Sequence, residues 1–167
     1  MPISLSTLPK TYTLETDMTP QQILKNLLVA AATALSFAAA QAQMTPVGNW
    51  HSMDEKTGEL KSLIVIADKG GVLNGHIEKL LRKEADQKGV CKECSDDRKD
   101  KPMLGLEIIR GAKQVEGKEV WESGKILDPE NGKEYTLRMT PTEGGKKLEV
   151  RGSIAFFGRT QTWTRVQ

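Results

Sequence analysis

Two cysteines, Cys91 and Cys94, are the residues of this 167-residue sequence whose spacing most directly suggests chemistry. In an oxidising compartment, two cysteines that are separated by two residues usually form a disulfide, which here would tighten a polar loop. Two alternatives stay open. A redox-active pair needs a thiol whose pKa is lowered, typically at a helix N-terminus. A structural zinc site needs two further ligands, and no second cysteine pair is present. The spacing therefore predicts a disulfide first and a thiol-disulfide redox centre as an alternative.

The other chemically capable side chains do not form a recognisable catalytic or metal-binding group. The acidic pair at 96–97 and the segment 128–131 lack the regular spacing of a calcium loop, and turns favour the same residue types. His51 and His76 fall on predicted strands, without a nucleophile beside them in the sequence. We therefore expect no catalytic residue, no metal and no cofactor, and a protein that is not an enzyme.

Composition narrows the class of protein only broadly. Charged residues make up 28% of the chain and the formal net charge is +2, so neither nucleic acid nor another anionic partner is indicated. The length suits one domain after a leader.

Residues 1–42 have the pattern of a leader for export. Lys25 precedes an uncharged apolar run of about 14 residues, which is shorter than the ~20 needed to span a bilayer. Small residues follow, ending at Ala42. We expect a Sec-type signal peptide that begins at Met18, cleavage after Ala42 and a mature chain starting at Gln43. The product, residues 43–167, is expected to be a single domain in the periplasm or secreted, without a stable membrane anchor.

From Val47 onward, strand-like runs alternate with turn signals, and no window shows the apolar stripe of a helix. The cleanest alternation places Tyr135, Leu137 and Met139 on one face. Eight successive antiparallel strands avoid exposed edges best by closing into an up-and-down barrel. A β-sandwich is the alternative architecture. The predicted strands cover 48–53, 60–67, 72–80, 104–112, 120–127, 134–139, 147–154 and 159–166.

The ends of the predicted sheet carry residues suited to closing it. Gly48 and Trp50 lie on the first strand, and Trp163 and Arg165 lie on the last. A guanidinium stacked on a buried indole would hold the two strands together. In an up-and-down barrel the opposite end is formed by the first, third, fifth and seventh connections. That mouth is expected to include the long Cys91–Cys94 loop and the residues Asp128, Asn131, Phe156, Phe157 and Arg159.

The predicted interior favours a small apolar or amphipathic ligand, because its side chains are mid-sized and few are aromatic. Gly75 and Gly152 are expected to leave space in this wall. The alternatives are an envelope structural or protein-interaction module whose barrel is filled by side chains, and the redox protein mentioned above. The residues expected to line a ligand site are Leu73, Ile77, Leu106, Ile108, Tyr135, Leu137, Met139, Val150 and Ile154.

The mature part of the sequence contains a series of short motifs between residues 47 and 166. They include Asp54-x-Lys56-Thr57-Gly58, Gly75-x-Ile77, Cys91-x-x-Cys94, Lys101-Pro102-x-x-Gly105, Asp128-Pro129-x-Asn131-Gly132-Lys133-x-Tyr135, Val150-Arg151-Gly152 and Phe157-Gly158-Arg159-Thr160-Gln161-x-Trp163-x-Arg165. Together these motifs resemble a family of bacterial secreted proteins, domain of unknown function 2147. The resemblance implies export and a lipocalin-like (calycin) barrel, and it supplies no catalytic residue because the family has no established activity. Members often have an aromatic residue where this chain has Ser153.

Overall fold

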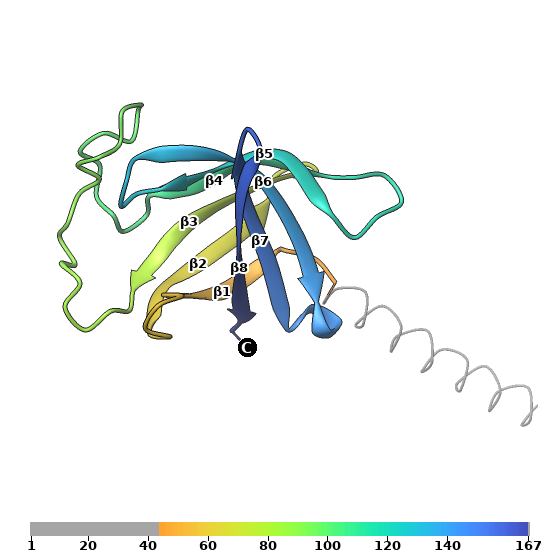
Figure 1. The fold of residues 1–167 in the computed structure, drawn as a ribbon, viewed down its shortest axis with the longest axis horizontal. Helices are drawn as coiled ribbons and strands as arrows, with labels where there is room; N and C mark the ends of the chain where they lie inside the picture. Colours follow the sequence, from red (N-terminus) through yellow and green to blue (C-terminus); the bar gives the residue numbers. More distant parts are fainter. Residues whose placement is uncertain (1–43, 167) are drawn as a thin grey trace, which may run out of the picture. The chain divides into compact units, whose positions relative to one another are not determined.

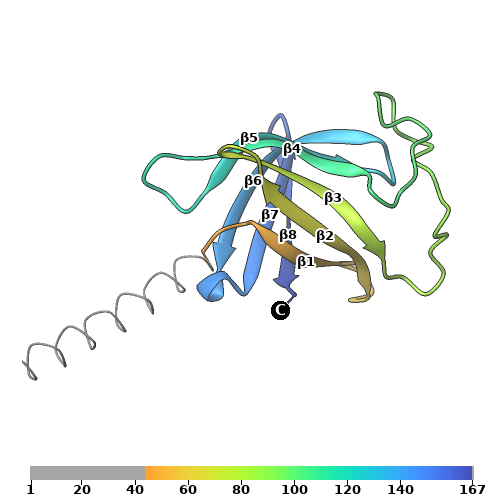
Figure 2. The same ribbon diagram turned by 180° about the vertical axis from the view of Figure 1, so that it is seen from behind.

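The computed structural model describes residues 44–166, which form a closed, antiparallel eight-stranded β-barrel (Figures 1 and 2). Each strand pairs with the next one along the chain, and β8 pairs with β1. The described part contains one short 3₁₀ helix, Glu143–Gly145, and no α-helix. The strands are β1 (Gly48–Met53), β2 (Leu60–Asp68), β3 (Val72–Leu80), β4 (Glu107–Gln114), β5 (Trp121–Asp128), β6 (Lys133–Thr142), β7 (Lys147–Ile154) and β8 (Phe157–Arg165).

The all-β class and the closed barrel agree with the sequence prediction, whereas the β-sandwich alternative is wrong. The expected signal peptide, its start at Met18 and its cleavage after Ala42 lie outside the described residues. Within residues 44–166, no helix is long and apolar enough to cross a membrane.

The fourth strand begins at Glu107, three residues later than expected from the sequence. Gly105 turns the chain with a φ of 80°, and Leu104 before it is 39% exposed. A second irregularity decides which face of β5 is inside. Ser123 has a φ of 64° and the β5–β6 register shifts there, so Trp121 and Gly124 both face the interior. Simple alternation cannot anticipate such a bulge.

Arg165 and Trp50 meet where β8 pairs with β1. The guanidinium carbon of Arg165 lies 4.2 Å from the centre of the Trp50 ring, and Trp50 is fully buried. The indole Nε1 donates a hydrogen bond to the carbonyl oxygen of Pro46 at 2.7 Å. Arg165 itself donates to the carbonyl oxygens of Thr45, Val47 and Gly145 at 2.6, 2.8 and 2.6 Å. One side chain thus joins both ends of the barrel domain and the β6–β7 connection.

Trp163 has a different position from the one expected of a closing residue. It pairs with Leu148 of β7, and its indole Nε1 donates to Gln161 Oε1 at 3.1 Å. The β1–β8 pairing comprises Trp50 with Arg165 and His51 with Thr164. Trp163 therefore belongs to the interior wall, directly beside the seam residue Thr164.

Candidate functional site: a cavity at the open end

A cavity of about 1010 Å³ occupies the half of the barrel that lies opposite the Trp50–Arg165 seam. We call this half the open end, because the β1–β2, β3–β4, β5–β6 and β7–β8 connections surround it. The segment between β3 and β4 also forms part of the wall, through Ala85, Val90 and Met103. Apolar side chains that project into the cavity from the strands are Ile64, Ile77, Ile108, Ile126, Val150 and Trp163.

Polar atoms in the strand-borne wall are bonded to one another. The hydroxyls of Ser52 and Ser62 are buried and lie 2.7 Å apart. Gln161 accepts the hydrogen bond from Trp163, and the hydroxyl of Tyr135 accepts one from Asn131 Nδ2 at 3.2 Å. The interior therefore presents a largely apolar surface, and its few polar groups are already partnered.

The residues expected to line a ligand site divide into two groups by depth. Ile77, Ile108, Tyr135, Val150 and Ile154 are in the lining of the cavity. The other four, Leu73, Leu106, Leu137 and Met139, lie outside the lining and belong to the packed core, with exposed fractions of 1, 3, 1 and 0%. Alternation identifies the inward face of a strand, but it contains no information about depth along the barrel axis. Leu73, Leu137 and Met139 thus fill the part of the interior nearest the seam, whereas Leu106 is buried in the β3–β4 connection at the open end.

Gly75 and Gly152 do not leave the empty space that was expected beside them. A Cβ on Gly152 would lie 3.1 Å from Cβ of Tyr135, and one on Gly75 would lie 3.2 Å from Cδ1 of Ile109. Both contacts are tighter than normal packing. The neighbouring side chains therefore already occupy the room that these glycines leave.

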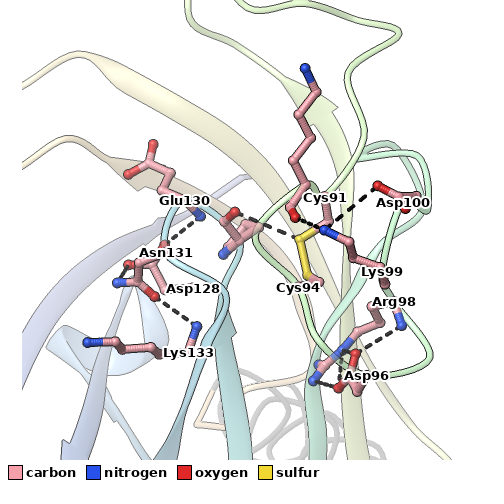
Figure 3. Close-up of a disulfide and its surroundings, with 12 residues drawn as sticks. Cys91, Cys94, Asp96, Arg98, Lys99, Asp100, Asp128, Glu130, Asn131 and Lys133 are labelled. Carbon is pink, nitrogen blue, oxygen red and sulfur yellow. Dashed lines mark hydrogen bonds and ion pairs between the residues drawn. A yellow bond between two sulfur atoms is a disulfide. The ribbon is translucent and has the colours of Figure 1, made fainter.

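The residues expected at the mouth are found there, with different roles. Asp128 accepts a hydrogen bond from the amide of Glu130 at 3.0 Å and one from Asn131 Nδ2 at 2.9 Å, so both residues shape the β5–β6 turn (Figure 3). Arg159 and Phe157 line the cavity, although Phe157 is 84% exposed. Phe156 is completely exposed and lies outside the lining.

Cys91 and Cys94 are joined as a disulfide whose two residues are 0 and 2% exposed. Figure 3 shows the disulfide beside the β5–β6 turn. The Sγ atom of Cys91 lies 3.8 Å from the carbonyl oxygen of Pro129. The loop also touches Gly132 so closely that a Cβ there would lie 1.8 Å from the carbonyl oxygen of Glu93. The disulfide loop is therefore packed onto the barrel through the β5–β6 turn.

A buried arginine that the sequence analysis missed anchors the same loop. Arg98 is 3% exposed, and its guanidinium forms ion pairs with Asp96 and with Glu134 of β6, the latter at 2.7 Å. It also donates to the carbonyl oxygen of Glu107 at 3.2 Å. Hydrogen bonds from Arg98 lower the pKa of the Asp96 carboxyl to about 2. Nothing in the polar run of residues 82–102 distinguishes Arg98 from the other cations, because its partner on β6 is 36 residues away.

Ion pairs join the inter-strand connections that surround the open end. Arg82 donates to Asp54 of the β1–β2 turn at 2.5 Å and to Glu130 of the β5–β6 turn at 2.8 Å. Lys61 pairs with Glu130 at 2.9 Å, and Arg159 pairs with Glu55. Burial raises the pKa of Glu130, but the bonds from Lys61 and Arg82 outweigh it and leave that pKa below its ordinary value. The rim is therefore charged, with cations and carboxylates paired.

The described residues contain no cluster of three or more histidine, cysteine, aspartate or glutamate side chains that could hold a metal ion. His51 and His76 lie on β1 and β3, and His76 Nε2 is 3.2 Å from Glu78. Neither histidine lines the cavity.

The sequence of the barrel matches one known protein family. The model of a family described as "Uncharacterized protein conserved in bacteria (DUF2147)" matches residues 48–165. The chain belongs to this family. The matched range begins at the first residue of β1 and ends at the last residue of β8, so the DUF2147 family corresponds to the whole barrel.

One solved structure is similar to this DUF2147 barrel. It is HP1028 from Helicobacter pylori, a protein described as belonging to the lipocalin family. The TM-score is 0.61 at 17% sequence identity, and the match covers 72% of this chain and 82% of that one. At this identity the likeness concerns the fold alone, which is lipocalin-like. No curated protein matches the chain.

Proposed function

We propose that this protein is an exported, non-enzymatic binding protein whose barrel takes up one small apolar or amphipathic ligand. The observation that carries the proposal is the cavity of about 1010 Å³ behind a charged rim. Its size is comparable with that of pockets that enclose small organic ligands. Ile64, Ile108 and Val150 would contact the apolar part of the ligand, and the polar end would remain at the rim with water and the ion-paired side chains.

Export is supported by the leader pattern of the sequence and by the disulfide. Disulfides persist mainly in oxidising compartments such as the periplasm. The burial of Cys91 and Cys94 favours a structural disulfide over the redox alternative, because a partner thiolate must reach one of the sulfurs to exchange with it.

Binding is favoured over the alternative of a side-chain-filled interaction module by the contrast between the two halves of the barrel. Leu137 and Met139 fill the half near the seam, whereas the open half contains the cavity. A barrel that served only as a rigid platform would gain stability by filling both halves, since buried apolar contacts are the main source of stability.

The test is the uptake of a fluorescent fatty-acid analogue by the exported protein, for which we expect saturable binding in the low micromolar range. Ile126 is only partly buried and faces the cavity, so Ile126→Trp should fill part of the space and weaken uptake strongly. Its matched control is Lys125→Trp, because Lys125 is the next residue on β5 and is exposed. Gly152→Trp should also block uptake, although its contact with Tyr135 makes some loss of stability expected.

Absence of saturable uptake, in a protein whose thermal unfolding is normal, would contradict the proposal and favour the interaction module. Equal loss of uptake in Ile126→Trp and Lys125→Trp would show that the probe binds outside the barrel. Native mass spectrometry of protein purified from its own envelope would then identify any natural ligand.

A further inference from the structure

The β7–β8 turn at the open end carries the most exposed apolar side chains of the described chain. Phe156 is 100% exposed, Phe157 is 84% exposed and Ile154 is 47% exposed. Phe157 and Ile154 also line the cavity, so its apolar wall continues without a break onto this surface. The turn is drawn in dark blue at the top of the barrel in Figure 1. Large exposed apolar groups that gather in one place usually mark an interaction surface.

Near the turn, the β7–β8 hairpin itself carries only basic charged side chains, and its one acidic residue, Glu149, lies further from the turn on β7. From Val150 to the C-terminus the sequence contains Arg151, Arg159 and Arg165, and no acidic residue. Arg165 lies at the seam, whereas Arg151 and Arg159 flank the exposed turn. Arg159 is paired with Glu55. Arg151 donates only a long hydrogen bond to Thr160 Oγ1, at 3.4 Å, and forms no ion pair with a described carboxylate.

We propose that this turn, which we call the aromatic tip (Ile154, Phe156 and Phe157), docks on the surface of an anionic lipid bilayer. The phenylalanine rings would enter the boundary between headgroups and acyl chains, and Arg151 would lie among the anionic headgroups. The same orientation turns the mouth of the cavity toward the bilayer, where an apolar ligand could pass without crossing water. The proposal goes beyond ligand binding, because docking does not require that the cavity be occupied.

A tryptophan placed at the tip reports docking directly. The native tryptophans Trp50, Trp121 and Trp163 are 7% exposed or less, so they form a constant background. In the exported protein, Phe156→Trp should shift its emission to shorter wavelength and become shielded from acrylamide when vesicles of equal parts phosphatidylglycerol and phosphatidylcholine are added. Lys118→Trp, in the exposed β4–β5 turn at the other end of the barrel, is the matched control and should not change.

Variants that lack the added tryptophan measure how much each side chain contributes to vesicle binding. Removing one inserted ring should weaken partition into the anionic vesicles roughly tenfold, and Phe156→Ser is the preferred change because the side chain has no packing to lose. Arg151→Gln should weaken it roughly fivefold, and raised salt should remove this difference. Vesicles of phosphatidylcholine alone should bind the protein less tightly.

Three results would overturn the proposal. The first is a Phe156→Trp emission that anionic vesicles leave unchanged, and the second is equal partition of Phe156→Ser and the unaltered protein. The third is burial of the Phe156→Trp indole by self-association without vesicles, which would assign the tip to a second copy of the chain. Because Phe156 lies outside the cavity lining, Phe156→Ser should take up a soluble probe normally, so failure of docking and failure of ligand binding are distinguishable.

Discussion

At the end of the barrel near the seam, Trp50, Leu137 and Met139 are fully or almost fully buried, and Arg165 donates to three backbone carbonyls. At the open end, by contrast, contacts between connections are made by charged side chains such as Arg82 and Glu130, around a cavity. Packed apolar groups stabilise a fold far more than exposed ion pairs do. The comparison indicates that one end of the same eight strands provides stability, which leaves the other end free to vary its shape and chemistry.

The largest expected effect is that of Trp50→Ala at the seam. Truncating a large, fully buried aromatic residue should lower the free energy of unfolding by about 3–5 kcal/mol. The neighbouring exposed residue supplies the control, because Asn49→Ala on the same strand should change stability little. Chemical denaturation of both variants measures the difference, and similar midpoints for the two would show that the seam is not the stabilising region.

Arg165→Ala should be next in size, at about 2–3 kcal/mol, because it removes hydrogen bonds from a charged donor to three carbonyls together with the contact to Trp50. Arg165→Lys should recover only part of this loss, since an ammonium cannot reproduce the planar geometry of the guanidinium. Arg82→Ala at the open end should cost only about 0–1 kcal/mol. Equal losses at positions 165 and 82 in thermal unfolding would break the comparison between the two ends.

Replacing both cysteines, in a Cys91→Ser and Cys94→Ser variant, should cost about 2 kcal/mol or less, because the disulfide closes a very short loop. The loss should be local. Hydrogen exchange should become faster in residues 82–103 and stay unchanged in β1 and β8. A thiol reagent should likewise fail to react with the folded, unreduced protein, and rapid reduction under native conditions would revive the redox alternative.

Lowering the pH should destabilise the open end before the seam. This effect should be smaller than those of the substitutions at Trp50, Arg165 and the cysteines. The pKa of the Asp96 carboxyl is about 2 in the folded protein, compared with 3.8 for an aspartate without such partners. Since the folded value is lower, the stabilisation is complete above the unfolded value and is lost as the pH falls from about 4 toward about 2. The hydrogen bonds of Arg165 to the carbonyl oxygens of Thr45, Val47 and Gly145 involve no carboxylate and should persist. Hydrogen exchange corrected for pH should therefore increase in residues 82–103 before it does in β8, and Asp96→Asn should remove this difference.

The sequence predicted the features that depend on neighbours along the chain. Alternation gave the inward face of β6, and Asp128 and Asn131 form the turn that their residue types favour. It did not predict contacts between segments that are distant in the sequence. The anchoring of Arg98 by Glu134 is of this kind, and so is the division of inward-facing residues into packed ones such as Met139 and cavity-lining ones such as Val150.

The short seam between β1 and β8 has a mechanical consequence. The paired residues are Trp50 with Arg165 and His51 with Thr164, and the two strands are antiparallel, so Gly48 and Arg165 lie at the same end of the barrel. A pulling force applied to the two ends of the domain would act across the hydrogen bonds of the seam and load them one after another. The barrel should therefore unzip at low force from Arg165 inward, although the same residue protects it well against heat and denaturant.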